Sequence, residues 1–237
     1  MLKKFYLCFR KKLNNFISQS MKSALKIHLL IALLAVVFSL NAQVYRLELG
    51  VNNPYRYGNV KGLINYFDGI KLGATAEYNL KNNFSLLTGA LYNFIYSDNF
   101  QGNPNSLGVT YTTYGHSLDI PIRLTYTYPL NKSLKLFGFA GPNLNIGLFQ
   151  NMKITSTQTY DSSNPYYVKP RSVDLYNGND SEYQLNRLNL QIGLGGGVQW
   201  KKYQLKAGYD FGINNLNKLN SGNLNQEGWY ISVAYEF

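Results

Sequence analysis

The chain has 237 residues, with 23 lysines and arginines against 12 aspartates and glutamates, and 21 of its residues are tyrosine. Seven of the basic residues lie within residues 1–42, so 16 basic and 12 acidic residues remain after them and give no case for nucleic-acid binding. The single cysteine, Cys8, lies in the same segment, which excludes disulfides and thiol chemistry from the rest of the chain.

Residues 21–42 have the pattern of a secretory signal peptide. Lys22 and Lys26 precede the run 29–40, which is apolar except for Ser39 and too short to cross a bilayer as a helix. A cleavage site follows at Ala42. We therefore expect three parts: residues 1–20 as an extension from a mis-chosen start, residues 21–42 as the signal, and residues 43–237 as one domain.

Eight later segments alternate apolar and polar residues, as half-buried β-strands do. In chain order they cover residues 45–52, 70–79, 84–96, 118–126, 134–148, 188–198, 204–213 and 228–237. Segments 84–96 and 134–148 are apolar on both faces and hard to phase. The other six each have one apolar face and one polar face.

The last segment is the most informative. Its apolar face consists of Trp229, Ile231, Val233, Tyr235 and Phe237. In a transmembrane β-barrel, lipid covers such a face and the first strand closes the sheet. A final strand that stops on an aromatic residue is typical of the signal by which the barrel-assembly machinery inserts outer-membrane proteins.

The connections alternate between long and short. Short turns are expected at 80–83, 129–133 and 201–202, and long loops rich in Asn, Ser and Gly at 53–68, 97–115, 150–186 and 214–227. Outer-membrane barrels have short periplasmic turns and longer extracellular loops. The pattern therefore predicts that both termini face the periplasm.

The polar faces carry both signs of charge in equal number. We expect ten inward side chains to form a lumen charge network: Arg46, Lys71, Arg123, Arg187 and Lys206 against Glu48, Glu77, Asp119, Asp210 and Glu236. An eight-stranded barrel has room inside only for side chains, and unpaired buried charge is costly. The balance therefore predicts a packed polar core and no channel. A soluble lipocalin-like barrel would instead require an apolar interior.

Several motifs resemble one family. Residues 117–126 contain Leu-Asp-Ile-Pro, residues 139–142 read Phe-Ala-Gly-Pro, residues 195–197 are Gly-Gly-Gly, and residues 209–216 read Tyr-Asp-Phe-Gly-Ile-Asn-Asn-Leu. In this order they resemble the PorT-like outer-membrane β-barrel family of Bacteroidetes. The resemblance implies an outer-membrane barrel, while a role in protein secretion belongs to only some members.

Two local features are candidates for a functional site or a distortion. His116 beside Ser117 would suit a lipid-modifying barrel enzyme, but adjacent strand residues point to opposite faces and do not meet as base and nucleophile. Pro121 lacks a ladder donor, so we expect a bulge or distortion there.

The sequence thus predicts an all-β fold, an eight-stranded antiparallel up-and-down transmembrane barrel in the cell outer membrane. We expect no enzymatic activity, cofactor or metal. The expected partners are outer-membrane lipid, the assembly machinery and a protein bound at the extracellular loops. The alternatives are a component of a PorT-type secretion apparatus and a lipid-modifying enzyme.

Overall fold

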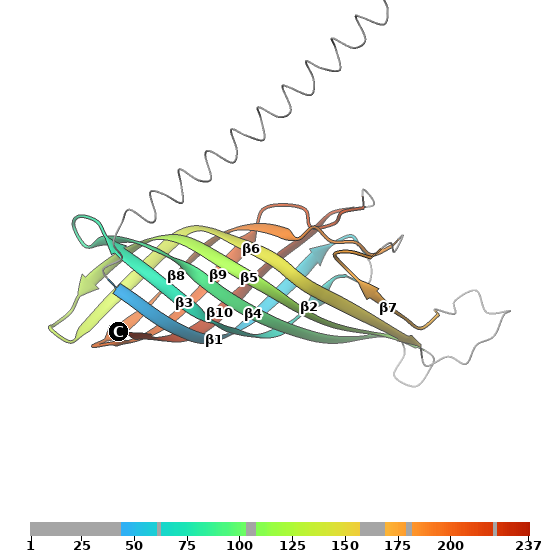
Figure 1. Cartoon of the computed structure of the whole chain (residues 1–237), viewed down its shortest axis with the longest axis horizontal. Helices are drawn as coiled ribbons and strands as arrows, with labels where there is room; N and C mark the ends of the chain where they lie inside the picture. Colours follow the sequence, from blue (N-terminus) through green and yellow to red (C-terminus); the bar gives the residue numbers. More distant parts are fainter. Residues whose placement is uncertain (1–43, 61–62, 103–107, 157–168, 179–181, 220–221) are drawn as a thin grey trace, which may run out of the picture. The chain divides into compact units, whose positions relative to one another are not determined.

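Eight long antiparallel strands close into a ring (Figure 1). They are β1 (Val44–Gly58), β3 (Asp68–Asn79), β4 (Phe84–Gly102), β5 (Gly108–Pro129), β6 (Leu134–Ser156), β8 (Leu188–Trp200), β9 (Tyr203–Gly212) and β10 (Leu224–Glu236). Each pairs with the next along the chain, and β10 pairs with β1 from Glu236 opposite Arg46 to Leu224 opposite Gly58. Closure leaves no unpaired sheet edge around the ring itself, although residues 97–102 of β4 extend beyond β3 and pair only with β5.

The computed structural model describes residues 44–60, 63–102, 108–156, 169–178, 182–219 and 222–237. The predicted leader extension and signal peptide lie outside the described residues. In the part described, no helix is both long and apolar enough to span a membrane. Two short strands add to the ring: β2 (Asn65–Tyr66) pairs with β1, and β7 (Arg171–Asp174) pairs with β6.

The predicted alternation of faces is confirmed. On β1 the four predicted outward residues, Tyr45, Leu47, Leu49 and Val51, are all more than half exposed, whereas Arg46 and Glu48 are buried. The same odd–even division holds on β10 and the residue after it, where Trp229, Ile231, Val233, Tyr235 and Phe237 are all exposed. The apolar side chains form the outside of the ring, and the charged ones lie within it.

The structure also resolves the two segments that are hard to phase from the sequence. On β4 the buried side chains include Leu87, Leu91 and Ile95, and on β6 they include Phe137 and Phe139. Phe137 and Phe139 pack with Tyr230 as a small apolar cluster inside the ring. The interior is therefore mixed, with apolar side chains among the charged ones.

The short turns at 80–83, 129–133 and 201–202 are confirmed at one end of the ring, with the ends of β1 and β10 beside them (Figure 1). Asn82 and Asn83 have φ of 56° and 66°, a conformation that Asn tolerates better than most residues. The predicted long loops include residues that the structure places in strands. β1 continues to Gly58, β4 and β5 leave only residues 103–107 between them, and β6 continues to Ser156.

Of the bulge or distortion expected at Pro121, the structure shows a distortion without a bulge, since the described β4–β5 ladder gives no partner to Ile120 or Pro121. Thr88 lies opposite Ile122 and Leu91 opposite Asp119, so the register between β4 and β5 is the same on both sides of the proline. The register shift instead lies between His116 and Ser117, which pair with Phe149 and Gly147, so the extra residue on β6 is Leu148. Pro121 is tolerated at an inward, buried position of the described ladder.

A second apolar cluster, the apolar cap, lies at the long-loop end. Its buried members are Val60, Leu63, Tyr111, Met152, Ile154, Val173, Leu175, Leu185, Leu216 and Leu224. They come from β5, β6, β7 and β10 and from the segments that follow β1, β7 and β9 and precede β8, and β5 and β6 lie across the ring from β1 and β10. The cap therefore lies across the long-loop mouth of the barrel.

Candidate functional site

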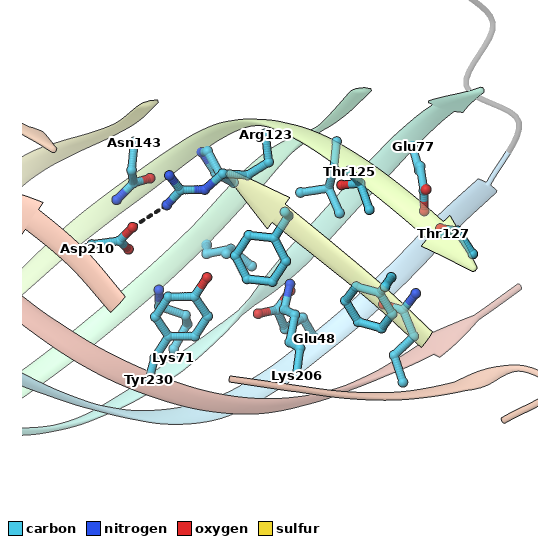
Figure 2. A pocket seen from close by; sticks show the side chains of 16 residues that line it. Glu48, Lys71, Glu77, Arg123, Thr125, Thr127, Asn143, Lys206, Asp210 and Tyr230 are labelled. Carbon is cyan, nitrogen blue, oxygen red and sulfur yellow. Dashed lines mark hydrogen bonds and ion pairs between the residues drawn. The ribbon is translucent and has the colours of Figure 1, made fainter. Parts of the chain in front are cut away.

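The lumen charge network contains most of the buried charged side chains of the described residues. Nine of its ten predicted members form ion pairs inside the ring: Arg46 with Glu77 and Glu236, Lys71 with Asp119, Arg123 with Asp210, and Lys206 with Glu48. All are buried except Glu236, which is partly exposed. Figure 2 shows the central part of this network, with Arg123 extended toward Asp210.

The first group stands at the seam where the chain closes. Lys206 of β9 donates from Nζ to Glu48 Oε2 of β1 at 2.5 Å, and Ser232 of β10 donates from Oγ to Glu48 Oε1 at 2.8 Å. One carboxylate thus connects three consecutive strands of the ring. Both its oxygens are satisfied, which a buried charge requires.

Near the short-turn end, Arg46 lies between two carboxylates. It donates to Glu77 of β3 and, at 3.0 Å, to Glu236 of β10, so it links the strands on both sides of β1. Ser85 Oγ also donates to Glu77, and Gln199 Nε2 donates to Glu236 at 3.0 Å. Neighbouring side chains, and not solvent alone, therefore form hydrogen bonds with these charged groups.

At mid-height, two ion pairs flank Tyr230. Lys71 Nζ lies 2.9 Å from Asp119 Oδ2 and 4.3 Å from the centre of the Tyr230 ring, where a cation–π contact is favourable. Asn145 Nδ2 donates to Asp119 Oδ1 at 2.6 Å. Arg123 pairs with Asp210 of β9, which is not a neighbouring strand, so this pair crosses the lumen.

The prediction is wrong for Arg187. Its side chain is exposed and donates to the carbonyl oxygens of Gly147 and Leu148 at 3.0 and 2.8 Å, and to Asn177 Oδ1 at 2.7 Å. Its guanidinium carbon lies 4.9 Å from the centre of the Tyr176 ring. Arg187 precedes β8, so the inward phase of that strand does not extend to it.

Arg56 is the buried cation that the sequence analysis missed. It is 2% exposed and donates from Nε to Gln226 Oε1 and from an Nη atom to Gln150 Oε1, both at 2.8 Å. Its guanidinium also lies 4.8 Å from the centre of the Phe67 ring. Arg56 falls in a stretch that we assigned to a loop, although its even number continues the inward phase of Arg46 and Glu48.

Little free space remains within the lumen. The volume open to the centre of a water molecule is about 20 Å³ around Phe137, Phe139 and Tyr230, about 40 Å³ beside Asp119 and Asn145, and about 10 Å³ beside Arg56. One water needs roughly 10–15 Å³ by this measure. These cavities hold a few waters and no larger ligand.

A wider recess lies at the short-turn mouth. It offers about 340 Å³ by the same measure and is lined by Arg46, Glu77, Lys135, Gln199 and Glu236, among others. The recess opens at the short-turn end, and its inner side stops at the paired charges Arg46, Glu77 and Glu236. The recess is thus an open cup and not a passage.

His116 and Ser117 lie on opposite sides of the strand, as predicted. The His116 ring faces outward, hydrogen-bonded through Nδ1 to the Tyr92 hydroxyl and 5.3 Å from the centre of the Phe94 ring. Ser117 accepts a hydrogen bond from Asn145 Nδ2 at 2.9 Å in the lumen. The two side chains do not form a base–nucleophile pair. Among the described residues, no group of three or more His, Cys, Asp and Glu is placed to hold a metal ion.

Comparisons with known proteins agree with this architecture. The model of a family described as "Outer membrane protein beta-barrel domain" matches residues 18–218. No curated protein is similar enough in sequence to count as a relative.

Three solved structures illustrate the similarity. A major outer membrane protein from Thermus thermophilus is 15% identical, with 81% of this chain and 99% of that chain covered and a TM-score of 0.39. The attachment invasion locus protein Ail of Yersinia pestis is 14% identical over 82% and 98%, with a TM-score of 0.37. The outer membrane enzyme PagL is 11% identical over 79% and 98%, with a TM-score of 0.35.

Proposed function

Because this chain belongs to the outer membrane protein beta-barrel domain family, we propose that it is a non-enzymatic barrel acting as a structural component or by presenting its long loops to a protein partner. Its place is the outer membrane. Lipid contacts the apolar exterior, and the assembly machinery recognises the face of β10 formed by Trp229, Ile231, Val233, Tyr235 and Phe237.

The observation that carries the proposal is the filled lumen. Ion pairs such as Arg123–Asp210 cross it, and the remaining cavities hold only a few waters. A conducting barrel needs a continuous aqueous path, and an eight-stranded ring is just wide enough to be filled by its side chains. We therefore assign no transport function to the interior.

Planar-bilayer recording of the refolded protein tests this assignment, with an open porin in the same membrane as the positive control. We expect no current steps above the baseline of the lipid alone. Sustained conductance of the wild-type protein would contradict the proposal.

We propose that the short turns and both termini face the periplasm. Outer-membrane barrels place their short turns on that side, and the cap-forming loops then lie outside the cell. Residues 21–42 would act as the signal peptide. Protease added to intact cells should cut the chain on the long-loop side and spare the short turns, and the mature N-terminus should begin near Gln43.

The extracellular surface supports a partner-binding role. β4, β5 and β6 continue past the level at which β8 and β9 end, and β7 pairs with the extension of β6 (Figure 1). The apolar cap includes Tyr111 of β5 and Met152 and Ile154 of β6, so these extensions pack into it. A preformed surface costs less entropy on binding than a flexible loop.

The resemblance of the Leu-Asp-Ile-Pro strand and its companions to the PorT-like family of Bacteroidetes keeps a secretion component as an alternative. A deletion strain assayed for secreted surface proteins separates the two. Unchanged secretion would exclude a secretion component and leave the structural or partner-binding function.

The lipid-modifying enzyme remains a second alternative because His116, bonded to Tyr92, faces the hydrocarbon side of the wall. Mass spectra of lipid A from a His116→Ala strain decide it. We expect them to match the wild type, whereas a changed acylation pattern would establish an enzyme.

A further inference from the structure

Exposed charge is distributed unevenly between the two ends of the barrel. All three short turns carry lysine, at Lys81, at Lys132 and at Lys201 with Lys202, and Lys135 lies beside the second turn. All five side chains are exposed, and among the described residues none of them forms an ion pair with a carboxylate.

The long-loop end differs. Its exposed or partly exposed basic residues, Lys153, Lys169, Arg171, Arg187 and Lys218, are matched in number by Asp68, Asp98, Asp174, Glu182 and Glu227 in the described segments. Arg171 and Glu182 also form an ion pair there. Among the residues that the structure describes, positive charge is therefore concentrated at the short-turn end.

Four of the lysines form one patch. The Lys201 backbone N–H donates to the Ser133 carbonyl oxygen at 2.8 Å, so the turns at 129–133 and 201–202 are neighbours in space. β6 and β8 pair directly below them, from Leu134 opposite Trp200. We call Lys132, Lys135, Lys201 and Lys202 the lysine rim. The nearby acid Glu236 is already bonded to Arg46.

The rim adjoins an outward aromatic platform. Trp200 stacks with Tyr203 at 6.3 Å between ring centres, and Tyr203 contacts Tyr235 at 5.3 Å. Lys201 Nζ lies 5.1 Å from the centre of the Trp200 ring, and Lys202 Nζ lies 5.9 Å from that of Tyr235. Exposed Trp and Tyr rings mark the boundary between hydrocarbon and headgroups in membrane proteins. The two ammonium groups are therefore held at headgroup depth.

We propose that the lysine rim binds phospholipids with a net-negative headgroup in the leaflet that surrounds the short turns. The inference rests on the outer-membrane location and the proposed orientation, which puts this end in the phospholipid leaflet. A phosphodiester without a compensating cation pairs with the ammonium groups, while its acyl chains lie against Trp200 and Tyr203. A zwitterionic headgroup gains less because its own cation competes for the phosphate.

The two tryptophans of the chain supply a direct test. Trp200 lies at the rim, and Trp229 lies further along β10 toward the long-loop end, where Asn53 and Tyr209 flank it. In a Trp229→Phe variant, quenching by dibrominated lipids reports the lipids beside the rim. In a Trp200→Phe variant it reports the lipids at the other site, as an internal control.

The refolded variants are reconstituted in vesicles that mix plain phosphatidylcholine with dibrominated phosphatidylglycerol or dibrominated phosphatidylcholine. Because each lysine near a charged lipid surface contributes about fivefold in affinity, we expect Trp200 to show at least a roughly fivefold preference for phosphatidylglycerol. Sodium chloride should weaken it through screening. Trp229 should show no preference.

A Lys132→Gln, Lys201→Gln, Lys202→Gln variant should abolish the preference at Trp200. The matched control with the same charge change, Lys153→Gln, Lys169→Gln, Lys218→Gln, should retain it. Equal quenching of Trp200 by both lipids, or a preference that survives the rim variant, would overturn the lysine rim as a lipid site. Absence of quenching by either lipid at both tryptophans would instead overturn the membrane location itself.

Discussion

Glu48 and Lys206 form an ion pair across β10, the strand that lies between them, although they are 158 positions apart in the chain. The pair therefore depends on closure of the ring and not on local sequence. Ser232 of the intervening strand donates to the same carboxylate. This contact joins the first strand to the last two, and it makes the seam a direct test of the lumen charge network.

Glu48→Gln should destabilise the folded barrel by about 3 to 5 kcal/mol, because removing one partner leaves Lys206 as an uncompensated buried charge. The measurement is the free energy of unfolding in urea with vesicles present. Adding Lys206→Met to the same protein should recover much of the loss. The exposed pair offers a control, since Glu182→Gln should cost no more than about 1 kcal/mol. Equal effects at the two sites would contradict the buried network.

Gly193→Ala should disturb the pair that crosses the lumen. A methyl group at Gly193 would meet Asp210 Oδ1 and the terminal nitrogens of Arg123, so that ion pair would have to move. We expect a cost of about 1 to 3 kcal/mol, as for other overpacked interiors. Gly138→Ala on the outer face is the control, since its nearest contact would be 3.7 Å away, and it should change stability by less than about 0.5 kcal/mol.

Phe237→Ala should impair assembly more than stability. The Phe237 ring is 67% exposed and makes an edge contact with Tyr235, while its backbone N–H bonds the Tyr45 carbonyl oxygen whatever the side chain. We expect the assembled fraction in cells to fall several-fold. Phe211→Ala, which also removes an exposed ring, should match it in the free energy of unfolding and assemble normally. Normal assembly of Phe237→Ala would show that the Phe237 ring is not part of an insertion signal.

The turn after β7 should loosen in acid. Partial burial acts to raise the pKa of Asp174, but hydrogen bonds from the N–H groups of Tyr176 and Asn177 outweigh it and hold that pKa below its ordinary value of 3.8. A carboxylate with a lowered folded-state pKa stabilises the turn above its ordinary pKa, and the contribution is lost as the pH falls through the folded value.

Amide hydrogen exchange at Tyr176 and Asn177 measures this loss. The wild type should be better protected than Asp174→Ala at about pH 6. The difference should vanish at a pH well below the ordinary Asp174 pKa of 3.8. A difference that persists in acid would show that the turn does not depend on the ionised carboxylate.

The sequence predicted the faces of the ring well because side-chain direction alternates with a fixed period of two. That is why nine of the ten proposed lumen residues lie where expected, including Asp210 and Arg123 on distant segments. Phasing was ambiguous where both faces were apolar, as around Phe137 and Phe139 on β6, because these rings fill the lumen as readily as they would face lipid. Only the partners across the ring, such as Tyr230, determine their direction.

The long-loop end was the part that the sequence did not predict. β1 extends to Gly58 through a stretch whose Asn, Pro and Tyr content resembles that of loops, and β6 extends to Ser156 through residues that we assigned to the following loop. Their pairing there depends on the apolar cap, whose members are scattered singly between polar residues and meet only after the ring has closed. Arg56 was missed for the same reason, and Arg187 was misplaced because an inward phase was extended past the start of β8.

Single cysteines at positions 229 to 234, introduced one at a time and spin-labelled in reconstituted protein, test the orientation of the wall most directly. Collision with oxygen, which concentrates in hydrocarbon, should be frequent at 229, 231 and 233 and rare at 230, 232 and 234. Uniform collision rates along β10, or rates with the opposite phase, would contradict a closed barrel with an apolar exterior and an ionic interior.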